Sequence, residues 1–549
     1  MNNTTAKSSI AGKGARARLL AASLYLLLCG AGASAADYVY VVKPGDNPWN
    51  LTQRYLKSVD YWPRIQAYNH IDAPTHIPPG TLLRIPLAWM RAEATDARVL
   101  EVSGTAERES AGRTEPIVPG MGVGEGALIR SGDDSSLTLE FPDGSRSLVG
   151  ANTEIRVHRL QRLRASDGQQ TEIELRGGEL ENNVERANPG GRYIIRTPAA
   201  VAAVRGTGFR VAADARSMRT ETLEGKVAMT NRRGGVLLPA GTGSYTTVGE
   251  KPRAASPLLP APDLSSLPGI IDRVPFRLPI EPVAGATGYR TQIAASASFA
   301  ALLSDRTAAD AAVQGSAALP DGTYRMRTRA IGAHGLEGHD AEREIIIDAR
   351  PEPPFPSQPA QDGFVTEAAV RFAWAHDPGA RSYHFQLASD PGFVAIAAQS
   401  DQLTEPGIEL GEALEPGDYY WRVAVSTNAE GRGPYSDTQR FRRPLPGPST
   451  EPPEIDSDTL RLGWRAQQGV ERYQAEISST ADFSAPEHRI ETTDTALSIP
   501  RPQSGTWHVR VRSQEAGAPY GPWSKAQQIE VPYDYWRALW VLLPLLLAL

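Results

Sequence analysis

Residues 136–148 carry the pattern that decides the fold of the central part of the chain, and they read SLTLEFPDGSRSL. Leu137, Leu139 and Phe141 alternate with polar residues, and an alternation of this period is typical of a strand with one buried face. Asp143-Gly144 interrupts the alternation, and an Asp-Gly pair between two such runs predicts a hairpin turn. The stretch therefore predicts two antiparallel strands.

Strand-like patterns continue on both sides of this hairpin, and helical periodicity is absent from about residue 97 to residue 250. We therefore predict one all-β domain over 97–250, built either as a sandwich or as a short β-solenoid. The further strand-like runs are 172–175, 193–196, 209–212, 220–223 and 235–238.

Several short motifs stand out in this region: Ser131-Gly132-Asp133, Ser135, Leu137, Leu139, Phe141, Asp143-Gly144-Ser145, Gly177-Gly178-Glu179-Leu180, Thr197-Pro198, Val204-Arg205-Gly206-Thr207-Gly208-Phe209 and Glu224-Gly225-Lys226-Val227. Through these residues the region resembles the FecR domain. The resemblance implies a periplasmic sensing or partner-binding domain, because founding members relay an iron-uptake signal to a sigma factor. Arg205-Gly206-Thr207 is either a partner-binding turn or a structural turn with a positive φ at glycine, and we favour the structural interpretation.

A smaller unit precedes it over residues 37–90. Tyr38–Val42 and Thr81–Pro86 are short strand-like runs, and Tyr61–Tyr68 has helical spacing. Asn47 before Pro48 is a favourable start for another helix, since asparagine caps helices and proline suits the first helical position. The predicted order is strand, helix, helix, strand, and we assign the aromatic residues Trp49, Tyr55 and Trp62 to its core.

This unit resembles a LysM domain, through Val41, Gly45-Asp46, Trp49, Leu51, Tyr55, Trp62, Ile65, Asn69, Pro79-Gly80 and Leu83–Pro86. Asn47-Pro48 departs from the family's usual Thr/Ser-Leu. The resemblance implies binding of glycans that contain N-acetylglucosamine, mainly peptidoglycan, in a groove between two loops, 45–47 and 69–79. The candidate glycan-binding residues are Gly45, Asp46, Asn47, Asn69, Ile71, Asp72, Ile77 and Pro79.

Three repeats of about 90 residues follow a proline-rich linker at 251–273, and we place them at 274–350, 360–443 and 454–532. Tyr289, Tyr383 and Tyr473 align, and a phenylalanine follows each of them by ten residues. Other shared anchors are Ile280, Trp374 and Trp464; Gly322-Thr323-Tyr324 with Arg327, Gly417-Asp418-Tyr419 with Arg422, and Gly505-Thr506-Trp507 with Arg510. Gly433-Pro434-Tyr435-Ser436 parallels Gly521-Pro522-Trp523-Ser524 in the last two repeats only.

These repeats resemble fibronectin type III domains, and the first repeat has diverged most. Fold alone does not give their function. They are either rigid spacers or units that bind a partner through exposed loops.

Both ends of the chain carry apolar segments. Residues 1–36 have a basic start, an apolar run at 19–28 and small residues before Asp37, which is the pattern of a secretory signal peptide. Cleavage after Ala35 or Ala36 would remove Cys29, the single cysteine of the chain. The alternatives are an uncleaved N-terminal anchor and, less favoured because Leu28 is bulky, a lipoprotein with Cys29 as the lipid acceptor. The tail at 533–549 is apolar but too short to span a bilayer, so we expect a membrane-associated tail.

The composition narrows the class of function. The chain has 549 residues and a net charge of −6, which disfavours a nucleic-acid binder. Catalytic motifs such as Gly-x-Ser-x-Gly, His-Glu-x-x-His and the P-loop are absent, and we predict neither a catalytic residue nor a metal or cofactor. We expect a mainly β, multidomain, non-catalytic protein of the Gram-negative periplasm or cell envelope. The alternatives are an envelope signalling component and, less favoured, a peptidoglycan hydrolase or its accessory.

Overall fold

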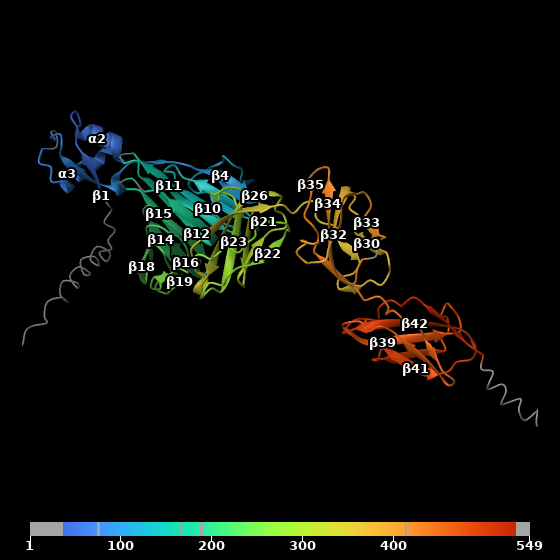
Figure 1. Cartoon of the computed structure of the whole chain (residues 1–549). Helices are drawn as coiled ribbons and strands as arrows, with labels where there is room; N and C mark the ends of the chain where they lie inside the picture. Colours follow the sequence, from blue (N-terminus) through green and yellow to red (C-terminus); the bar gives the residue numbers. More distant parts are fainter. Residues whose placement is uncertain are drawn as a thin grey trace, which may run out of the picture. The chain divides into compact units, whose positions relative to one another are not determined.

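The computed structural model describes residues 37–73, 77–164, 166–186, 188, 190–411 and 414–533 (Figure 1). The predicted signal peptide with Cys29, and the tail from Asp534 onward, lie outside the described residues. The chain divides between Ile347 and Asp348 into two compact units. The multidomain, mainly β architecture is confirmed, and within the described residues no helix is long and apolar enough to cross a membrane.

The first domain has the predicted order of strand, helix, helix and strand, with β1 antiparallel to β2. The Asn47 side chain caps helix α2 by accepting a hydrogen bond from the backbone N–H of Asn50, and Pro48 occupies its first turn. The elements are β1 (Asp37–Val41), α2 (Pro48–Tyr55), the 3-10 helix η1 (Val59–Tyr61), α3 (Trp62–Tyr68), β2 (Leu82–Pro86) and the 3-10 helix η2 (Leu87–Trp89).

The first domain is joined to the next by shared structure. The backbone N–H of Arg91 donates to the carbonyl of Tyr55 at 2.7 Å. Leu163, the last residue of strand β11 (Glu154–Leu163) of the second domain, is buried in the core of the first. The segment between the two domains is therefore part of the fold.

The second domain consists of two sheets that enclose one core. Strand β12 belongs to both sheets, because its first half pairs with β13 and its second half pairs with β15. After β12 the strands alternate between the two sheets in pairs: β13 and β14 lie in one sheet, β15 and β16 in the other, and β17 returns to the first. The domain thus combines features of the two predicted forms, a sandwich and a short β-solenoid. The strands are β3 (Ala92–Ala94), β4 (Ala97–Ser103), β5 (Ala106–Ser110), β6 (Arg113–Pro116), β7 (Gly122–Val123), β8 (Leu128–Ser131), β9 (Ser136–Glu140), β10 (Arg146–Val149), β11 (Glu154–Leu163), β12 (Gln169–Val184), β13 (Arg192–Arg196), β14 (Val201–Val204), β15 (Thr207–Ala213), β16 (Ser217–Thr222), β17 (Lys226–Asn231), β18 (Gly234–Pro239), β19 (Thr242–Thr247) and β20 (Ser256–Pro257).

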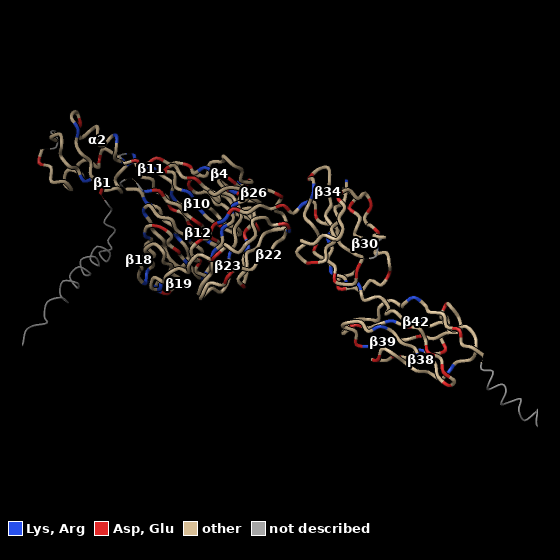
Figure 2. The backbone as a smooth tube through the Cα atoms, in the orientation of Figure 1, with Lys and Arg blue, Asp and Glu red and all other residues tan. Residues whose placement is uncertain are grey.

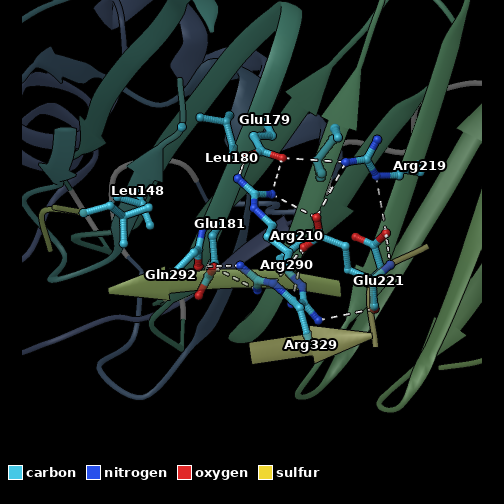
Figure 3. A pocket seen from close by; sticks show the side chains of 15 residues that line it. Leu148, Glu179, Leu180, Glu181, Arg210, Arg219, Glu221, Arg290, Gln292 and Arg329 are labelled. Atoms are coloured by element: carbon cyan, nitrogen blue, oxygen red, sulfur yellow. Dashed lines mark hydrogen bonds and ion pairs between the residues drawn. The ribbon is translucent and has the colours of Figure 1, made fainter. Parts of the chain in front are cut away.

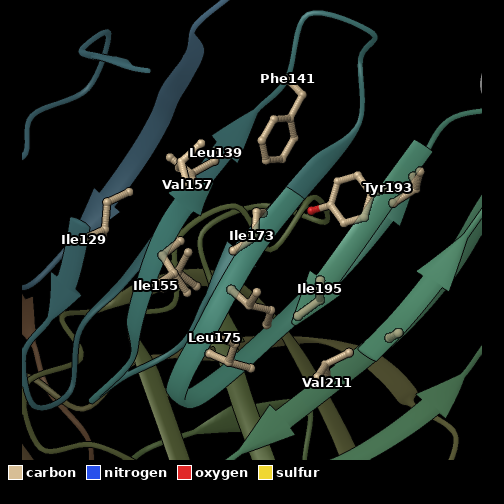
Figure 4. Packing of buried hydrophobic residues seen from close by; sticks show 14 of the residues in the cluster. Ile129, Leu139, Phe141, Ile155, Val157, Ile173, Leu175, Tyr193, Ile195 and Val211 are labelled. Carbon is tan, nitrogen blue, oxygen red and sulfur yellow. The ribbon is translucent and has the colours of Figure 1, made fainter. Parts of the chain in front are cut away.

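The core of this domain is mostly aliphatic, and it includes the aromatic side chains of Phe141 and Tyr193 (Figure 4). The ring of Tyr193 lies edge-on to Phe141 at 5.6 Å and to Phe209 at 6.2 Å between centroids. Its hydroxyl group is buried and hydrogen-bonds Ser147 Oγ at 2.5 Å and Asn182 Oδ1 at 3.1 Å. Burial raises the pKa of this phenol.

Replacing Tyr193 with phenylalanine is expected to destabilise this domain by about 1 kcal/mol, the net value of a typical hydrogen bond. The loss is small because Ser147 Oγ still donates to Asn182 at 2.7 Å. The free energy of unfolding from urea titration measures it. A loss several times larger would show that the hydroxyl group organises more of the core than its two bonds.

Each of the three repeats is a sandwich of two sheets. The first has β21 (Ile270–Ile271), β23 (Gly288–Ala294), β24 (Ser304–Ala308), β26 (Gly322–Ile331) and β27 (Ala341–Ile347) in one sheet, β22 (Phe276–Pro279) and β25 (Ala312–Gly315) in the other, and the 3-10 helix η3 (Ala333–Gly335). The second has β29 (Gly363–Phe364), β31 (Ala380–Ala388), β32 (Ile396–Leu403), β34 (Gly417–Thr427), β35 (Gly431–Arg432) and β36 (Gln439–Arg443), facing β28 (Pro356–Gln358), β30 (Val370–Trp374) and β33 (Gly407–Leu410). The third has β39 (Val470–Ser478), β40 (His488–Thr492), β42 (Gly505–Glu515) and β43 (Gln527–Val531), facing β37 (Glu454–Ile455), β38 (Thr459–Gly463) and β41 (Ala496–Pro500).

The anchors that align in sequence perform the same task in each repeat. Each aligned tyrosine hydroxyl accepts a hydrogen bond from the backbone N–H six residues before it, at 2.6, 2.9 and 3.1 Å. Each aligned phenylalanine has a left-handed backbone, with φ of 48°, 55° and 53°. Each aligned arginine lies over that phenylalanine ring, at 4.4, 3.8 and 4.2 Å. The internal repeat is therefore real at the level of individual side chains.

The segment predicted as a linker, 251–273, is not a free spacer. Strand β20 pairs with β19 of the second domain, and β21 pairs in parallel with β27 of the first repeat. Between them, Leu264 and Leu267 are buried. The proline-rich pattern missed these contacts, because each end of the segment adds a strand to the folded domain next to it.

Candidate functional site

The two loops predicted to form the glycan groove are held next to each other. The backbone N–H of Val42, just before the first loop, donates to the carbonyl of Thr81 at 2.9 Å. The N–H of Gly80, at the end of the second loop, donates to the carbonyl of Val42 at 2.8 Å. The structure therefore places 45–47 beside the end of 69–79; residues 74–76 of the second loop lie outside the described residues.

The polar side chains of the first loop are engaged within the domain. The Asp46 carboxylate accepts hydrogen bonds from the Tyr40 hydroxyl at 2.8 Å and from the backbone N–H of Lys43 at 2.7 Å. Burial and the bond to Asp46 raise the pKa of Tyr40. Because Asn47 caps α2, the side chains of this loop fix its backbone. Gly45, with φ of 88°, lies exposed at the turn.

The candidate glycan-binding residues of the second loop fall into two groups, those that hold the fold and those that are exposed. The Asn69 amide spans α3 and β2: it donates to the carbonyls of Ile65 at 2.9 Å and Arg84 at 2.8 Å, and accepts from the Arg84 N–H at 2.6 Å. Ile77 is buried and Ile71 packs partly against the same core. Asp72 and Pro79 are exposed.

The assignment of Trp49 to the core is wrong. Trp49 is 62% exposed, whereas Tyr55 and Trp62 pack partly against the core as predicted. Leu51 and Thr52 point into the core from α2, and at 100° per residue Trp49 lies 200° around the helix from Leu51. An aromatic ring therefore stands in solvent two residues after Asn47. Counting helix angles from Leu51 would have found it.

Two family models match the chain: FecR protein over residues 127–228 and LysM domain over residues 40–86. The chain contains a LysM domain and a FecR domain. Gly206 has a positive φ of 72°, as the structural interpretation of the FecR-domain turn predicted, and a Cβ there would meet Arg186 at 2.9 Å. Whether the turn also binds a partner stays a prediction.

No curated protein matches the chain. Among solved structures, two of a proposed anti-sigma factor from Parabacteroides distasonis are similar over 24% of this chain, at 20% and 22% identity and TM-scores of 0.20 and 0.21. This chain spans 59% of the length of each. The chicken CNTN1 FN1–FN3 domains are similar over 53% of this chain and 95% of theirs, at 15% identity and a TM-score of 0.19.

A second polar site lies where the FecR domain meets the first repeat, and sequence analysis missed it. Charges of both signs gather where β12 lies beside β23 (Figure 2). Among the described residues, five arginines and six carboxylates are linked there by ion pairs: Arg210, Arg219, Arg290, Arg327 and Arg329 with Glu179, Glu181, Glu221, Asp305, Glu337 and Asp340. We call this set the charged junction.

Side chains of the charged junction point toward one another across the boundary (Figure 3). The carboxylate of Glu181 accepts hydrogen bonds from both terminal nitrogens of Arg327, at 2.7 and 2.8 Å, in a bidentate pair. Burial alone would raise the pKa of Glu181, but Arg327, Arg329 and Arg210 hold it at about 2. Arg290 pairs with Glu179 of the FecR domain and with Glu337 of its own repeat.

Proposed function

We propose that the chain is a non-catalytic protein of the bacterial cell envelope that binds peptidoglycan through its LysM domain. The observation that carries the proposal is the pair of adjacent loops whose backbone is held by internal bonds of Asp46, Asn47 and Asn69. Gly45, Asp72 and Pro79 lie exposed on these loops, where they are available to contact N-acetyl groups. Trp49 stands beside the first loop, where a sugar ring could stack on it. The FecR domain supports a place in the periplasm of a Gram-negative cell.

Binding to purified sacculi tests the proposal directly. We expect the full chain to co-sediment with sacculi at moderate salt, and Trp49→Ala to weaken binding roughly tenfold, since exposed aromatic residues dominate binding energy when they become covered. Phe355→Ala is the matched control, because Phe355 is 77% exposed in the second repeat and should not affect binding. Absence of the full chain from the pellet would refute the proposal.

The candidate loops need a separate variant. Asp46→Ala removes the bonds to Tyr40 and Lys43 that hold the first loop, so it is expected to weaken sacculus binding without replacing an exposed group. If Asp46→Ala and the parent bind equally, the first loop is not part of the contact.

The non-catalytic assignment is part of the proposal and has its own test. In zymography on peptidoglycan we expect no lysis band from the full chain. A clear band would make the chain a hydrolase instead.

Signalling is a second candidate function, and the FecR match over 127–228 favours it. In that case the FecR domain would relay a signal to a regulatory protein, and the LysM domain would only anchor it. Crosslinking in intact envelopes followed by affinity purification distinguishes the two. Recovery of a sigma-factor regulator or sensor kinase would favour signalling, and recovery of glycan alone would favour anchoring.

A further inference from the structure

We propose that the face of the FecR domain formed by β12, β15 and β16 is a recognition surface for an arginine-bearing β-sheet, and that the first repeat is its dedicated occupant in the same chain. This inference goes beyond peptidoglycan binding and stands whether or not the LysM domain binds a glycan.

The two faces complement each other in both directions. Glu179 and Glu181 of the FecR domain meet Arg290 and Arg327 of the first repeat. Conversely, Arg210 of the FecR domain lies 3.7 Å from Glu337 and 3.6 Å from Asp340, and its Nη2 donates to the carbonyl of Gly338 at 2.5 Å. Crossed pairs of this kind fix the register of an interface, because a shifted register brings like charges together.

An apolar contact lies beside the charged junction. Phe299 and Leu302, in the turn after β23, are buried, and Leu148 of the FecR domain packs against them. Two hydrogen bonds support it: Thr138 donates to the carbonyl of Ala300 at 2.7 Å, and the N–H of Leu302 donates to Ser136 at 2.9 Å. The interface therefore has both an apolar anchor and a specific polar pattern.

Comparison with the other repeats shows that these residues are specialised. The N–H of Gly338 donates to the carbonyl eight residues before it, as do those of Gly433 and Gly521, so the three glycines are equivalent. Two residues further on, Tyr435 and Trp523 lie over the aligned arginines. The first repeat has Asp340 there, which pairs with Arg210 and Arg329.

The same substitution pattern extends to neighbouring positions. Glu337 aligns with Arg432 and Tyr520, and Arg290 aligns with His384 and Gln474. Arg510 of the third repeat aligns with Arg327 and pairs with Glu476 of its own sheet, so its charge is neutralised within the repeat. In the first repeat, Arg327 pairs instead with Glu181 of the FecR domain. Several of the positions at which the first repeat differs from the other two thus lie where it meets that domain.

One consequence concerns the partners of the FecR domain. A protein that recognises this face must displace the first repeat, so such partners are excluded while the repeat is docked. Partners that leave the repeat in place must use another surface of the FecR domain.

Aligned substitutions in the full chain test the proposal. Leu302 is 4% exposed at the interface, and the aligned Ile396 of the second repeat is 39% exposed. We expect Leu302→Asp to raise hydrogen exchange at least tenfold in residues 178–184 of β12 and 322–331 of β26. Ile396→Asp, the matched control, should leave exchange in both segments unchanged. Equal exchange in Leu302→Asp and the parent would overturn the proposal.

Swapping the charges across the interface tests the recognition itself. Glu181→Arg and Arg327→Glu should each accelerate hydrogen exchange in the same two segments. The double variant should slow hydrogen exchange again by at least threefold. Strand β11 serves as the check on folding, because it lies in the FecR domain away from the charged junction and should stay protected. A double variant that exchanges as fast as the single variants would refute recognition between these faces.

Discussion

Replacing Arg329 with leucine is expected to destabilise the first unit by about 3–5 kcal/mol, the cost of removing one partner from a buried ion pair. Arg329 is only 1% exposed. Its Nε lies 2.9 Å from Glu337, its Nη1 lies 3.3 Å from Asp340, and its Nη2 donates to Gln292 at 2.5 Å. Leucine removes one arginine from a buried cluster, so Glu337 and Asp340 keep fewer positive partners to offset the cost of burying their charge. Urea titration of the full chain, followed by hydrogen exchange in β12 and β26, measures the loss.

The aligned arginine of the third repeat provides the control. Arg512 lies over Trp523 at 4.3 Å and donates to Gln474 at 2.6 Å, and it is partly exposed. Arg512→Leu therefore removes packing and two hydrogen bonds to one amide oxygen without taking an ion-pair partner from a buried carboxylate. We expect a loss of about 1 kcal/mol, measured in β39 and β42. Equal losses in the two variants would show that burial of carboxylates at the charged junction is unimportant.

The stability of the first unit is expected to fall as pH rises from about 5 to 8, because of Glu221. This side chain is 1% exposed and faces Arg210 on β15, Arg219 on its own strand and Glu337 between β26 and β27. Burial, opposed by Arg210 and Arg219 and reinforced by Glu337, raises its pKa from 4.5 to about 7. The folded unit thus retains a proton that the unfolded chain has lost. That contribution is present below pH 4.5 and is lost as pH rises through 7, about 3 kcal/mol at most.

Glu221→Gln isolates this effect. The amide stays neutral at every pH, so the variant should match the parent near pH 5 and exceed its unfolding free energy at pH 8. Glu224→Gln, an exposed glutamate three residues later, is the control and should follow the parent. Parallel profiles for the parent and Glu221→Gln would contradict the assignment.

Lowering the pH below about 4.5 is expected to destabilise the first unit through two other buried carboxylates, Glu337 and Glu181. Although burial raises the pKa of Glu337, Arg329, Arg290 and Arg210 together hold it well below its usual range. Its contribution, like that of Glu181, is therefore present above pH 4.5 and is lost as pH falls. The first unit should therefore be most stable at about pH 4.5 to 5, between the acid loss through Glu181 and Glu337 and the loss at higher pH through Glu221.

Local sequence patterns correctly predicted the strands, turns and helix starts that depend on residues close together in the sequence. The alternation at Leu137, Leu139 and Phe141 predicted β9, and Asp143-Gly144 predicted the turn to β10, because both depend on backbone and side-chain periods. Asn47-Pro48 likewise predicted the start of α2. Trp49 was assigned wrongly because the helical spacing was judged without fixing which face pointed inward.

The sequence by itself determined the modules of this protein: a LysM domain, a FecR domain and three repeats whose aligned tyrosines, phenylalanines and arginines do the same work. Only the tertiary structure decided that the first repeat is docked on the FecR domain. The partners of that interface, such as Glu181 and Arg327, are separated by 146 residues, so no local period links them. Their pairing depends on two sheets meeting in one register, and electrostatic complementarity across such a distance is visible only in three dimensions.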